Sequence, residues 1–340
     1  MADDGIAFDG ESLTRGPLGG AESAFASLAL ALAARGHAVT ARTRCAADRM
    51  IGGVAWRRHE TPLPDETDLY IANRGHRLLP LVPRARRRAF WIHNPAGYLL
   101  KPRYLWPLWR TRPTIVFSGP SHLASYPGWA PGARAVISYG IAENFRGRTP
   151  AANPPPPRAI FTSNPLRSLD WVLRVWAERI RPRVAGAELH VFSGPTVYGE
   201  AGAARQAAMA AVLDRAAALR EAGVVLREPV PKDALRRELE SPRARLYRGD
   251  RGVTFCLAVA EAQAMGVPAV VCRIASLPER VRDGATGAVV ADGDEAEFAA
   301  AAIRLLGDDA LWLAQHRAAL ATQASFGWND AAAAFEKLIA

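Results

Sequence analysis

Residues 158–192 decide the fold class, and they read RAIFTSNPLRSLDWVLRVWAERIRPRVAGAELHVF. The β-rich ends of this stretch, residues 158–162 and 188–192, predict two strands. Residues 169–181 between them predict a helix, because apolar side chains recur at the spacing of one helical face. Those side chains are Leu169, Val172, Leu173 and Trp176. A strand, a helix and a second strand in this order indicate a parallel sheet covered by helices, so we expect an α/β protein.

The same alternation extends through both halves of the chain. In the first half, the predicted strands are residues 6–8, 39–41, 68–72, 89–92, 114–118 and 135–137, and the predicted helix is residues 21–35. In the second half, further strands are predicted at residues 224–226, 244–247, 268–272 and 287–290, and helices at residues 201–222, 232–240, 257–265 and from 295 onward. We therefore expect two doubly wound, Rossmann-like domains with a helical tail.

Four consecutive prolines at residues 154–157 separate the two halves. Proline holds the backbone extended and cannot enter a helix interior, so residues 151–157 predict a linker. A chain of 340 residues also exceeds what one hydrophobic core usually serves. We expect one domain over residues 1–150 and another over 158–325. Open α/β sheets bind ligands beyond the carboxyl ends of their strands, so the site is expected in a cleft between the domains.

The composition is that of an ordinary globular chain, with 49% apolar and 22% charged residues, which argues against disorder and collagen-like repeats. The acidic amino terminus lacks a hydrophobic run, so we expect a cytoplasmic location. The chain has three cysteines, Cys45, Cys256 and Cys272. Their odd number argues against a disulfide framework, and their spacing is not that of zinc ligands.

The net charge of +10 favours anionic partners. No module that reads nucleic acid is recognisable, so nucleic acid is not an expected partner.

Residues 251–268, RGVTFCLAVAEAQAMGVP, predict a loop that enters a helix. A helix amino terminus presents unpaired N–H groups and a partial positive charge, so the amides near Cys256 and Leu257 could hold a phosphate. Glu261 lies one turn further, where a carboxylate could accept hydrogen bonds from two neighbouring hydroxyls of a ribose. On composition alone, an ordinary surface glutamate is the favoured interpretation.

This stretch resembles the signature of the retaining nucleotide-sugar glycosyltransferases of family four, which have the GT-B fold. Those enzymes carry two glutamates separated by seven residues, the second followed by small residues, glycine and proline. The matching positions are Phe255, Leu257, Glu261, Ala262, Ala264, Gly266 and Pro268. Val253 occupies the position of the first glutamate, which in the family contacts the donor sugar or its neighbourhood. Asp250 is close enough in sequence to stand in for it.

Further motifs resemble the family along the whole chain and in the same order. Residues 16–22, GPLGGAE, resemble its glycine-rich loop, in which Gly19 and Gly20 would let the backbone approach a phosphate. Arg167 corresponds to a lysine that neutralises the donor diphosphate, and Thr162 stands where the family has a companion arginine. A cation at a helix start is poorly placed unless an anion intervenes, which favours a functional role for Arg167.

The resemblance also assigns the remaining site residues. His93 follows the predicted strand at residues 89–92 and corresponds to a histidine that faces the donor sugar. Together with Arg167 and Glu261 it forms the predicted catalytic group. The predicted donor-binding positions are Gly19, Gly20, Gly194, Val230, Val253, Cys256, Leu257 and Glu279. Among them, Gly194 and Val230 fall in regions that frame the nucleotide base, and Glu279 is either a supporting contact or a helix cap.

The implied activity is transfer of a sugar from a UDP- or GDP-linked donor to an unknown glycan, lipid-linked or small-molecule acceptor, with retention of configuration. Neither a metal nor another cofactor is expected, because Arg167 and helix amides would stabilise the leaving diphosphate. The resemblance further implies that residues 326–340 pack back on the first domain. Two alternatives stay open: a degenerate nucleotide binder without turnover, since the side chain of Val253 cannot accept a hydrogen bond, and a Rossmann-type NAD oxidoreductase. The absence of a G-x-G-x-x-G pattern counts against the second alternative.

Two segments of the first domain combine basic and aromatic residues: 84–88, RARRR, and 103–110, RYLWPLWR. Such a mixture suits an anionic membrane surface, with charges near the headgroups and tryptophans at the interface. A solvated basic face with tryptophans in the core is the open alternative. Peripheral contact with the inner face of a membrane is therefore a further expectation.

Overall fold

The computed structural model describes residues 1–195, 205–323 and 326–339. The chain forms two compact units, which we call unit 1 (Met1–Gly140 with Phe326–Ala340) and unit 2 (Ile141–Ser325). The division after Gly140 precedes the proline run at residues 154–157. None of the helices in the described ranges combines the length and the apolar character that crossing a bilayer requires.

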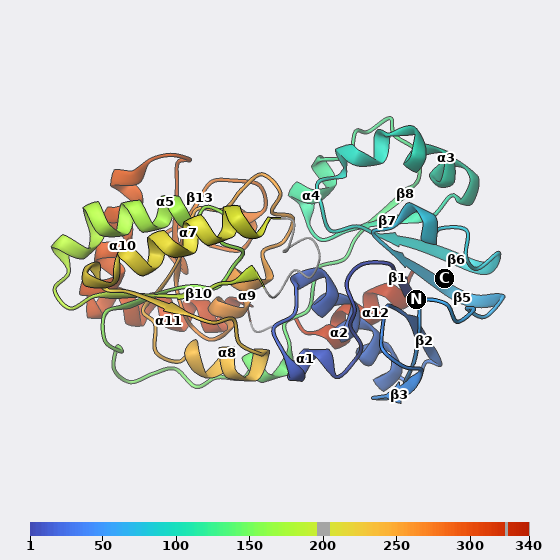
Figure 1. Ribbon diagram of the computed structural model, residues 1–340, viewed down its shortest axis with the longest axis horizontal. Coiled ribbons are helices and arrows are strands. Elements are labelled where there is room, and N and C mark those ends of the chain that lie inside the picture. Colours follow the sequence, from blue (N-terminus) through green and yellow to red (C-terminus); the bar gives the residue numbers. More distant parts are fainter. Residues whose placement is uncertain (196–204, 324–325, 340) are drawn as a thin grey trace. The chain divides into compact units, whose positions relative to one another are not determined.

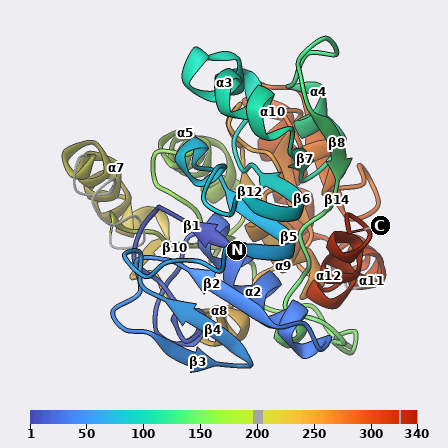
Figure 2. The ribbon, with the colours of Figure 1, turned by 90° about the vertical axis from the view of Figure 1, so that its right-hand side faces the viewer.

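Unit 1 is built on a sheet whose described strands lie in the order β3-β4-β2-β1-β5-β6-β7-β8, parallel except for the β3–β4 pair. The strands are β1 (Ala2–Asp3), β2 (Val39–Arg42), β3 (Arg49–Ile51), β4 (Val54–Arg57), β5 (Glu66–Asn73), β6 (Arg84–Trp91), β7 (Thr114–Phe117) and β8 (Ala133–Val136). The helices are α1 (Ser12–Arg15), α2 (Gly20–Ala34), η1 (His76–Leu78), η2 (Ala96–Leu100), α3 (Pro102–Thr111), α4 (Pro120–Ala124) and α12 (Trp328–Glu336). Helix α12 packs against α2, and both lie beside the sheet in Figure 2.

The predicted opening strand at residues 6–8 is wrong. The strand is Ala2–Asp3, which pairs with the end of β5 and with β2. Phe8 instead leaves the sheet and packs edge-on against Phe25 of α2 and Trp56 of β4. The apolar character of residues 6–8 therefore reflects an aromatic cluster and not strand pairing.

Unit 2 contains a second parallel sheet, in the order β11-β10-β9-β12-β13-β14 among the described residues. The strands are β9 (Arg158–Phe161), β10 (Glu188–Phe192), β11 (Val224–Arg227), β12 (Ala244–Tyr247), β13 (Ala269–Cys272) and β14 (Gly287–Val290). The helices are η3 (Glu143–Phe145), α5 (Leu169–Val175), η4 (Trp176–Ile180), η5 (Arg181–Arg183), α7 (Gln206–Ala218), η7 (Arg220–Ala222), α8 (Lys232–Glu238), α9 (Leu257–Ala264), η8 (Leu277–Glu279), α10 (Glu295–Gly307) and α11 (Asp309–Gln323). Residues 201–204 of the predicted helix 201–222 lie outside the described residues.

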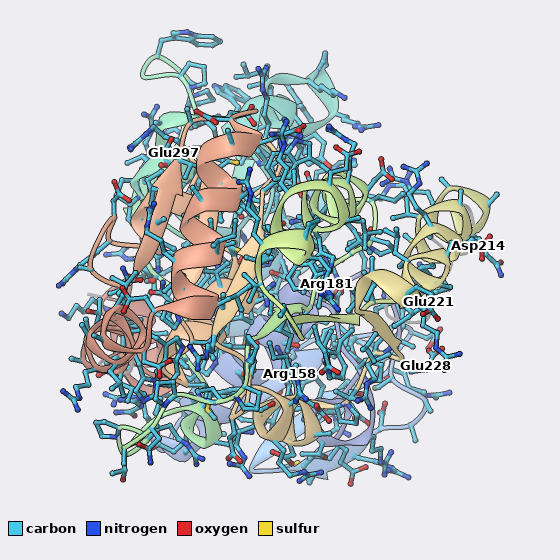
Figure 3. All side chains as sticks on the ribbon, turned by 90° about the vertical axis from the view of Figure 1, so that its left-hand side faces the viewer. Arg158, Arg181, Asp214, Glu221, Glu228 and Glu297 are labelled. Atoms are coloured by element: carbon cyan, nitrogen blue, oxygen red, sulfur yellow. The ribbon has the colours of Figure 1, made fainter. Side chains whose placement is uncertain are left out.

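Helices cover both faces of this second sheet. Helices α5, α7 and α10 lie on one face, and α8, α9 and α11 lie on the other (Figure 1). The apolar face predicted for residues 169–181 is buried, since Leu169, Leu173 and Trp176 have no exposed surface. On the outer side of the same layer, Glu297 of α10 and Asp214 of α7 point away from the core (Figure 3).

The order of the second sheet places β9 beside both β10 and β12. The chain runs from β9 to β11 on one side of the sheet and from β12 to β14 on the other. In open α/β sheets, ligands bind beyond the carboxyl ends of the strands at such a reversal of order. The loops after β9 and β12 are therefore the part of unit 2 where a ligand site is expected.

Candidate functional site

Helix α9 begins at the carboxyl edge of the second sheet. Its N-cap residue, Cys256, has a left-handed backbone conformation with φ of 67°, and no side chain caps the helix. A residue other than glycine rarely adopts this conformation. It turns the chain sharply, so that the first turn of α9 starts directly after the buried residues Val253 and Phe255. An uncapped helix start offers backbone N–H groups and a partial positive charge to an anion.

Three arginines lie around this helix start. Burial raises the pKa of the Cys256 thiol, and the positive charges of Arg245, Arg167 and Arg280 act in the opposite direction. Arg280 also stacks over the ring of Phe255, with 4.3 Å between the guanidinium carbon and the ring centroid. The three cations come from three separate loops or strands, so the fold gathers positive charge at the amino end of α9.

Arg167 is held by the loop that joins β9 to α5. Its backbone N–H donates to the Asn164 carbonyl at 2.9 Å, and its Nε lies 3.6 Å from Oδ2 of Asp250. Burial opposes the charge, but the neighbouring Tyr247 and Asp250 outweigh it and raise the pKa of Arg167. Asp250 is thus a partner of this arginine. The next residue, Ser168, donates from Oγ to the Gly249 carbonyl at 2.6 Å and joins the loops after β9 and β12.

Glu261 has a partner that the sequence analysis did not identify. The carboxylate is 2% exposed, and its two oxygens lie 2.6 and 2.7 Å from Nζ of Lys232, the first residue of α8. This ion pair holds the carboxylate in one orientation inside unit 2. Each oxygen keeps a second lone pair, so both can still accept a hydrogen bond from a ligand hydroxyl.

The other predicted positions of unit 2 fall around the same edge of the sheet. Val253 is 3% exposed, and its carbonyl accepts a hydrogen bond from Ser276 at 3.3 Å. Glu279 closes the short helix η8 and lies beside Arg280, with 3.8 Å between their charged atoms. Leu257, the first residue of α9, is buried.

Gly194 and Val230 come from neighbouring loops. Gly194 follows β10, and Pro229, which precedes Val230, follows β11. A Cβ atom on Gly194 would lie 3.0 Å from Cδ of Pro229, so the two loops touch at this glycine. The structure therefore places both positions at the ends of adjacent parallel strands.

His93 lies in unit 1, directly after β6, in a hydrogen-bonded network. Its Nε2 lies 2.6 Å from Oδ1 of Asn73, and its Nδ1 contacts the hydroxyl of Tyr139. Burial, together with the positive charge of Arg74, holds the pKa of His93 well below its usual value. The imidazole is therefore neutral at physiological pH. A neutral histidine can accept or donate a hydrogen bond without adding charge to its surroundings.

The glycine-rich loop leads to a first turn that already contains a carboxylate. Helix α2 starts at Gly20, and Glu22 in its first turn is 7% exposed. Oε1 of Glu22 lies 2.8 Å from Nη1 of Arg74. A Cβ atom on Gly19 would lie 2.4 Å from Oε2 of Glu22, so a side chain at position 19 would displace this carboxylate from its place beside Arg74.

The network of unit 1 continues to the end of the first strand. Arg74 donates from Nε and Nη2 to the two oxygens of Asp3, at 2.9 Å each, and Asn73 donates to the same carboxylate at 2.6 Å. The sequence alone did not predict a role for Asp3, Asn73, Arg74 or Tyr139. The sequence did contain a signal for three of them. Asp3 directly follows the apolar residues 1–2, and Asn73 and Arg74 directly follow the apolar run at residues 69–72. Of the predicted catalytic group, His93 thus lies in unit 1, and Arg167 and Glu261 lie in unit 2.

Comparison with known proteins identifies the family of the segment that carries the second site. Residues 157–308 match the model of the family described as glycosyl transferases group 1. The match covers 152 of the 340 residues and lies within unit 2. The matched segment contains Arg167, Lys232, Arg245, Cys256 and Glu261, so the gathered cations and the buried ion pair lie within it.

The sequence relatives match over a shorter stretch. The chain is 38% identical over 81 residues to D-inositol 3-phosphate glycosyltransferase 1 of Catenulispora acidiphila, which covers 24% of this chain and 19% of that protein. It is 42% identical over 85 residues to D-inositol 3-phosphate glycosyltransferase of Streptomyces scabiei, over 24% of this chain and 18% of that protein. The matches therefore span about a fifth of the length of these curated relatives.

The structural relatives extend over almost the whole chain. Sucrose-phosphate synthase from Thermosynechococcus elongatus has a TM-score of 0.74 at 16% identity, covering 98% of this chain and 97% of that one. Anabaena Alr3699/HepE in complex with UDP and glucose has a TM-score of 0.69 at 13% identity, covering 99% and 98%. WaaG, a glycosyltransferase involved in lipopolysaccharide biosynthesis, has a TM-score of 0.64 at 13% identity, covering 99% and 98%. The fold is of the GT-B type, as predicted: two parallel α/β sheets with helices and a helical carboxyl-terminal segment.

Proposed function

We propose that this protein is a glycosyltransferase that moves a sugar from a UDP- or GDP-linked donor to a glycan, lipid-linked or small-molecule acceptor. The observation that carries the proposal is the group of arginines around the uncapped start of α9, inside the segment that matches glycosyl transferases group 1. Departure of a nucleoside diphosphate builds negative charge on its terminal phosphate. Fixed cations and helix amides stabilise such charge most when water is excluded from around them.

Each side chain then has a distinct task. Arg167 would contact the diphosphate from the loop after β9, and the amides at the start of α9 would bind it from the segment after the neighbouring strand β12. Glu261 would accept hydrogen bonds from the ribose hydroxyls, with Lys232 holding the carboxylate in its orientation. Neutral His93 of unit 1 would face the sugar. No titratable group in this scheme is required to act as a nucleophile on the sugar.

The stereochemical course and the metal requirement are part of the proposal. We infer retention of configuration, with the acceptor attacking the face from which the diphosphate departs and the departing phosphate helping to take the acceptor proton. We also infer that no divalent metal is needed, because arginine side chains can supply the charge that would otherwise come from a cation. Anomeric analysis of the product by NMR tests the first inference, and activity in the presence of excess EDTA tests the second.

Release of nucleoside diphosphate from candidate donors tests turnover directly. UDP-glucose, UDP-N-acetylglucosamine, GDP-mannose and ADP-glucose, each incubated with the protein and a panel of acceptors, should include a donor that yields nucleoside diphosphate above the no-enzyme rate. Slow release without acceptor would also count as turnover. If one of these nucleotides binds tightly and none is cleaved, the protein is a binder without turnover, for which Val253 at the position of the family's first glutamate would be the reason. Binding of NAD alone would favour an oxidoreductase.

A second part of the proposal concerns helix α3. Trp106 and Trp109 are 62% and 60% exposed and stack on each other with ring centroids 5.5 Å apart. The exposed basic residues next to them are Lys101, Arg103, Arg110 and Arg112. We propose that this surface contacts an anionic membrane on its cytoplasmic side, with the tryptophans at headgroup depth. Co-sedimentation with phosphatidylglycerol vesicles should exceed that with phosphatidylcholine vesicles, and the double substitution W106S/W109S should abolish the excess.

A further inference from the structure

Arg245 is a buried cation with unpaired donors. It is the second residue of β12, and none of its surface is exposed. Its Nη1 donates to Oγ1 of Thr162 at 2.5 Å. Its Nε and Nη2 are also buried, and neither has an acceptor within the described ranges. Since arginine stays protonated, unit 2 buries a full positive charge with two N–H groups unused.

The unpaired edge of Arg245 has the shape that binds an oxyanion. Nε and Nη2 lie on one side of the guanidinium and point in parallel. In unit 1, Arg74 uses this same pair of nitrogens to bind both oxygens of Asp3, at 2.9 Å each. Arg35 uses the same pair to bind Glu336. In Arg245 neither nitrogen of this edge has an acceptor among the residues that the structure describes, so the edge is available to two oxygens of a ligand.

Arg243 provides the contrast within the same segment. It is also buried, at 9% exposed, but its guanidinium donates to the Pro155 and Leu306 carbonyls and pairs with Asp309 at 2.7 Å. Buried arginines with a structural role are satisfied in this way. Within the described part of the chain, Nε and Nη2 of Arg245 have no such partner, and the guanidinium lies over the Tyr247 ring, with 5.7 Å between its carbon and the ring centroid. The carboxylate that acts on it electrostatically, Glu261, is already paired with Lys232.

The position of Arg245 in the sheet points to a ligand. Strands β9 and β12 are neighbours at the point where the strand order reverses. The Arg245–Thr162 hydrogen bond crosses from β12 to the residue that follows β9, so it spans this point. Arg167 belongs to the loop after β9, and Cys256 starts α9 beyond β12. The unpaired guanidinium, the second arginine and the uncapped helix therefore surround one region at the carboxyl edge of the sheet.

We propose that Arg245 binds the diphosphate of the donor nucleotide, with its Nε and Nη2 donating two hydrogen bonds to phosphate oxygens. This assignment rests on the proposed function. Thr162 accepts the bond from Nη1 and orients the guanidinium. Thr162 also occupies the position at which the resemblance to family four places an arginine. Arg245 therefore supplies, from the adjacent strand, the charge that position 162 lacks.

Calorimetric titration of the full chain tests this assignment, with UDP, GDP, ADP and TDP as diphosphates and with the matched nucleosides as controls. Arg245→Met should weaken binding of the preferred diphosphate at least tenfold and leave binding of its nucleoside unchanged. The thermal midpoint of ligand-free R245M should equal or exceed that of the wild type, because the substitution removes a buried charge without a counter-ion. The matched control Arg243→Met should lower the midpoint and leave diphosphate affinity unchanged. If R245M does not fold, R245K replaces it, with an expected several-fold loss for the diphosphate alone.

Restoration gives the sharper result. The double variant T162R/R245M places a cation at position 162, beside position 245. Its diphosphate affinity should recover most of the loss. Unchanged diphosphate affinity in R245M, an equal loss for nucleoside and diphosphate, or no recovery in the double variant would each overturn the assignment. These outcomes all require a wild type that binds a nucleoside diphosphate. If the wild type binds none of the four, the proposed function fails, and the assignment fails with it.

Discussion

Nζ of Lys232 lies 2.6 and 2.7 Å from the two carboxylate oxygens of Glu261, and the glutamate is almost fully buried. Without the ammonium, this carboxylate would be buried with no ion-pair partner, which is strongly destabilising. Lys232 is one of only three lysines in a chain whose Lys and Arg total 43. The pair joins the start of α8 to the middle of α9. It therefore connects the segment after β11, which contains Val230, to the helix whose first turn is proposed to bind the diphosphate.

Removing the side chain of Lys232 should destabilise unit 2, because Glu261 would then be buried without its ion-pair partner. We expect Lys232→Met to lower the free energy of unfolding of unit 2 by about 3 kcal/mol at pH 7, as for other buried pairs that lose one partner. Urea denaturation followed by tryptophan fluorescence measures this loss. Arg236→Met, one turn further along α8, breaks an exposed pair with Glu240 and should cost less than about 1 kcal/mol. Equal losses in the two variants would show that Glu261 does not depend on Lys232.

Glu261 itself is expected to act on the nucleoside part of the donor. Glu261→Ala should lose one or two charge-assisted hydrogen bonds, each worth about 1.5 to 3 kcal/mol, and weaken nucleotide affinity about tenfold or more. Titration with UDP or GDP and with the 2′-deoxy analogues measures the effect. The substitution should reduce the affinity for the 2′-deoxy analogues by a smaller factor than the affinity for UDP or GDP. Glu297→Ala, on the outer face of α10 (Figure 3), is the control and should leave affinity unchanged.

Arg167 is expected to act on the phosphates alone. Arg167→Ala should reduce the affinity for nucleoside diphosphates by about tenfold or more, since the lost bonds involve two charged groups. Nucleoside affinity should not change. Arg158 begins the same strand that Arg167 follows, and it pairs with Glu188 at 3.2 Å (Figure 3). Arg158→Ala should therefore leave both affinities unchanged, and parallel losses for nucleoside and diphosphate in R167A would refute the phosphate role.

The attachment of the last helix should depend on pH. Hydrogen bonds from Arg35 and His37 lower the pKa of Glu336 on α12 to about 2, from an ordinary value of 4.5. A carboxylate with a lowered pKa stabilises the folded state above its unfolded-state pKa, and this contribution is lost as pH falls toward the folded-state value. Limited proteolysis should therefore release the carboxyl-terminal segment more readily as pH is lowered from about 5 toward 2. In Glu336→Gln this part of the pH dependence should be absent.

Much of the fold could be predicted because the strands of parallel sheets are short apolar runs between helices. The predicted strands at residues 158–162, 188–192 and 244–247 coincide with β9, β10 and β12 to within one residue. The hairpin of β3 and β4 was missed, although Gly52 and Gly53 between them have φ of 56° and 78° and are a typical two-residue turn. Its strands have only three and four residues and each contains an arginine, so alternation alone did not reveal them.

The candidate site could be predicted only in part, because side-chain partners depend on contacts between distant segments. The helix start at Leu257 and the loop position of Arg167 follow from local patterns. The pairing of Lys232 with Glu261 and of Arg245 with Thr162 does not, since each joins residues on different elements. The predicted helix 169–181 also differs in detail: α5 ends at Val175 and continues as a π-helical turn to Ile180, where Trp176 donates to the Ala222 carbonyl.

A crystal of the full chain soaked with UDP, and a second soaked with GDP, tests the central claim most directly. We predict that one of them shows the diphosphate at the amino end of α9, with oxygens within hydrogen-bond distance of Arg167 and of the first backbone amides of the helix, and with the ribose hydroxyls on Glu261. Nucleotide bound elsewhere, with the start of α9 free of it, would contradict the account.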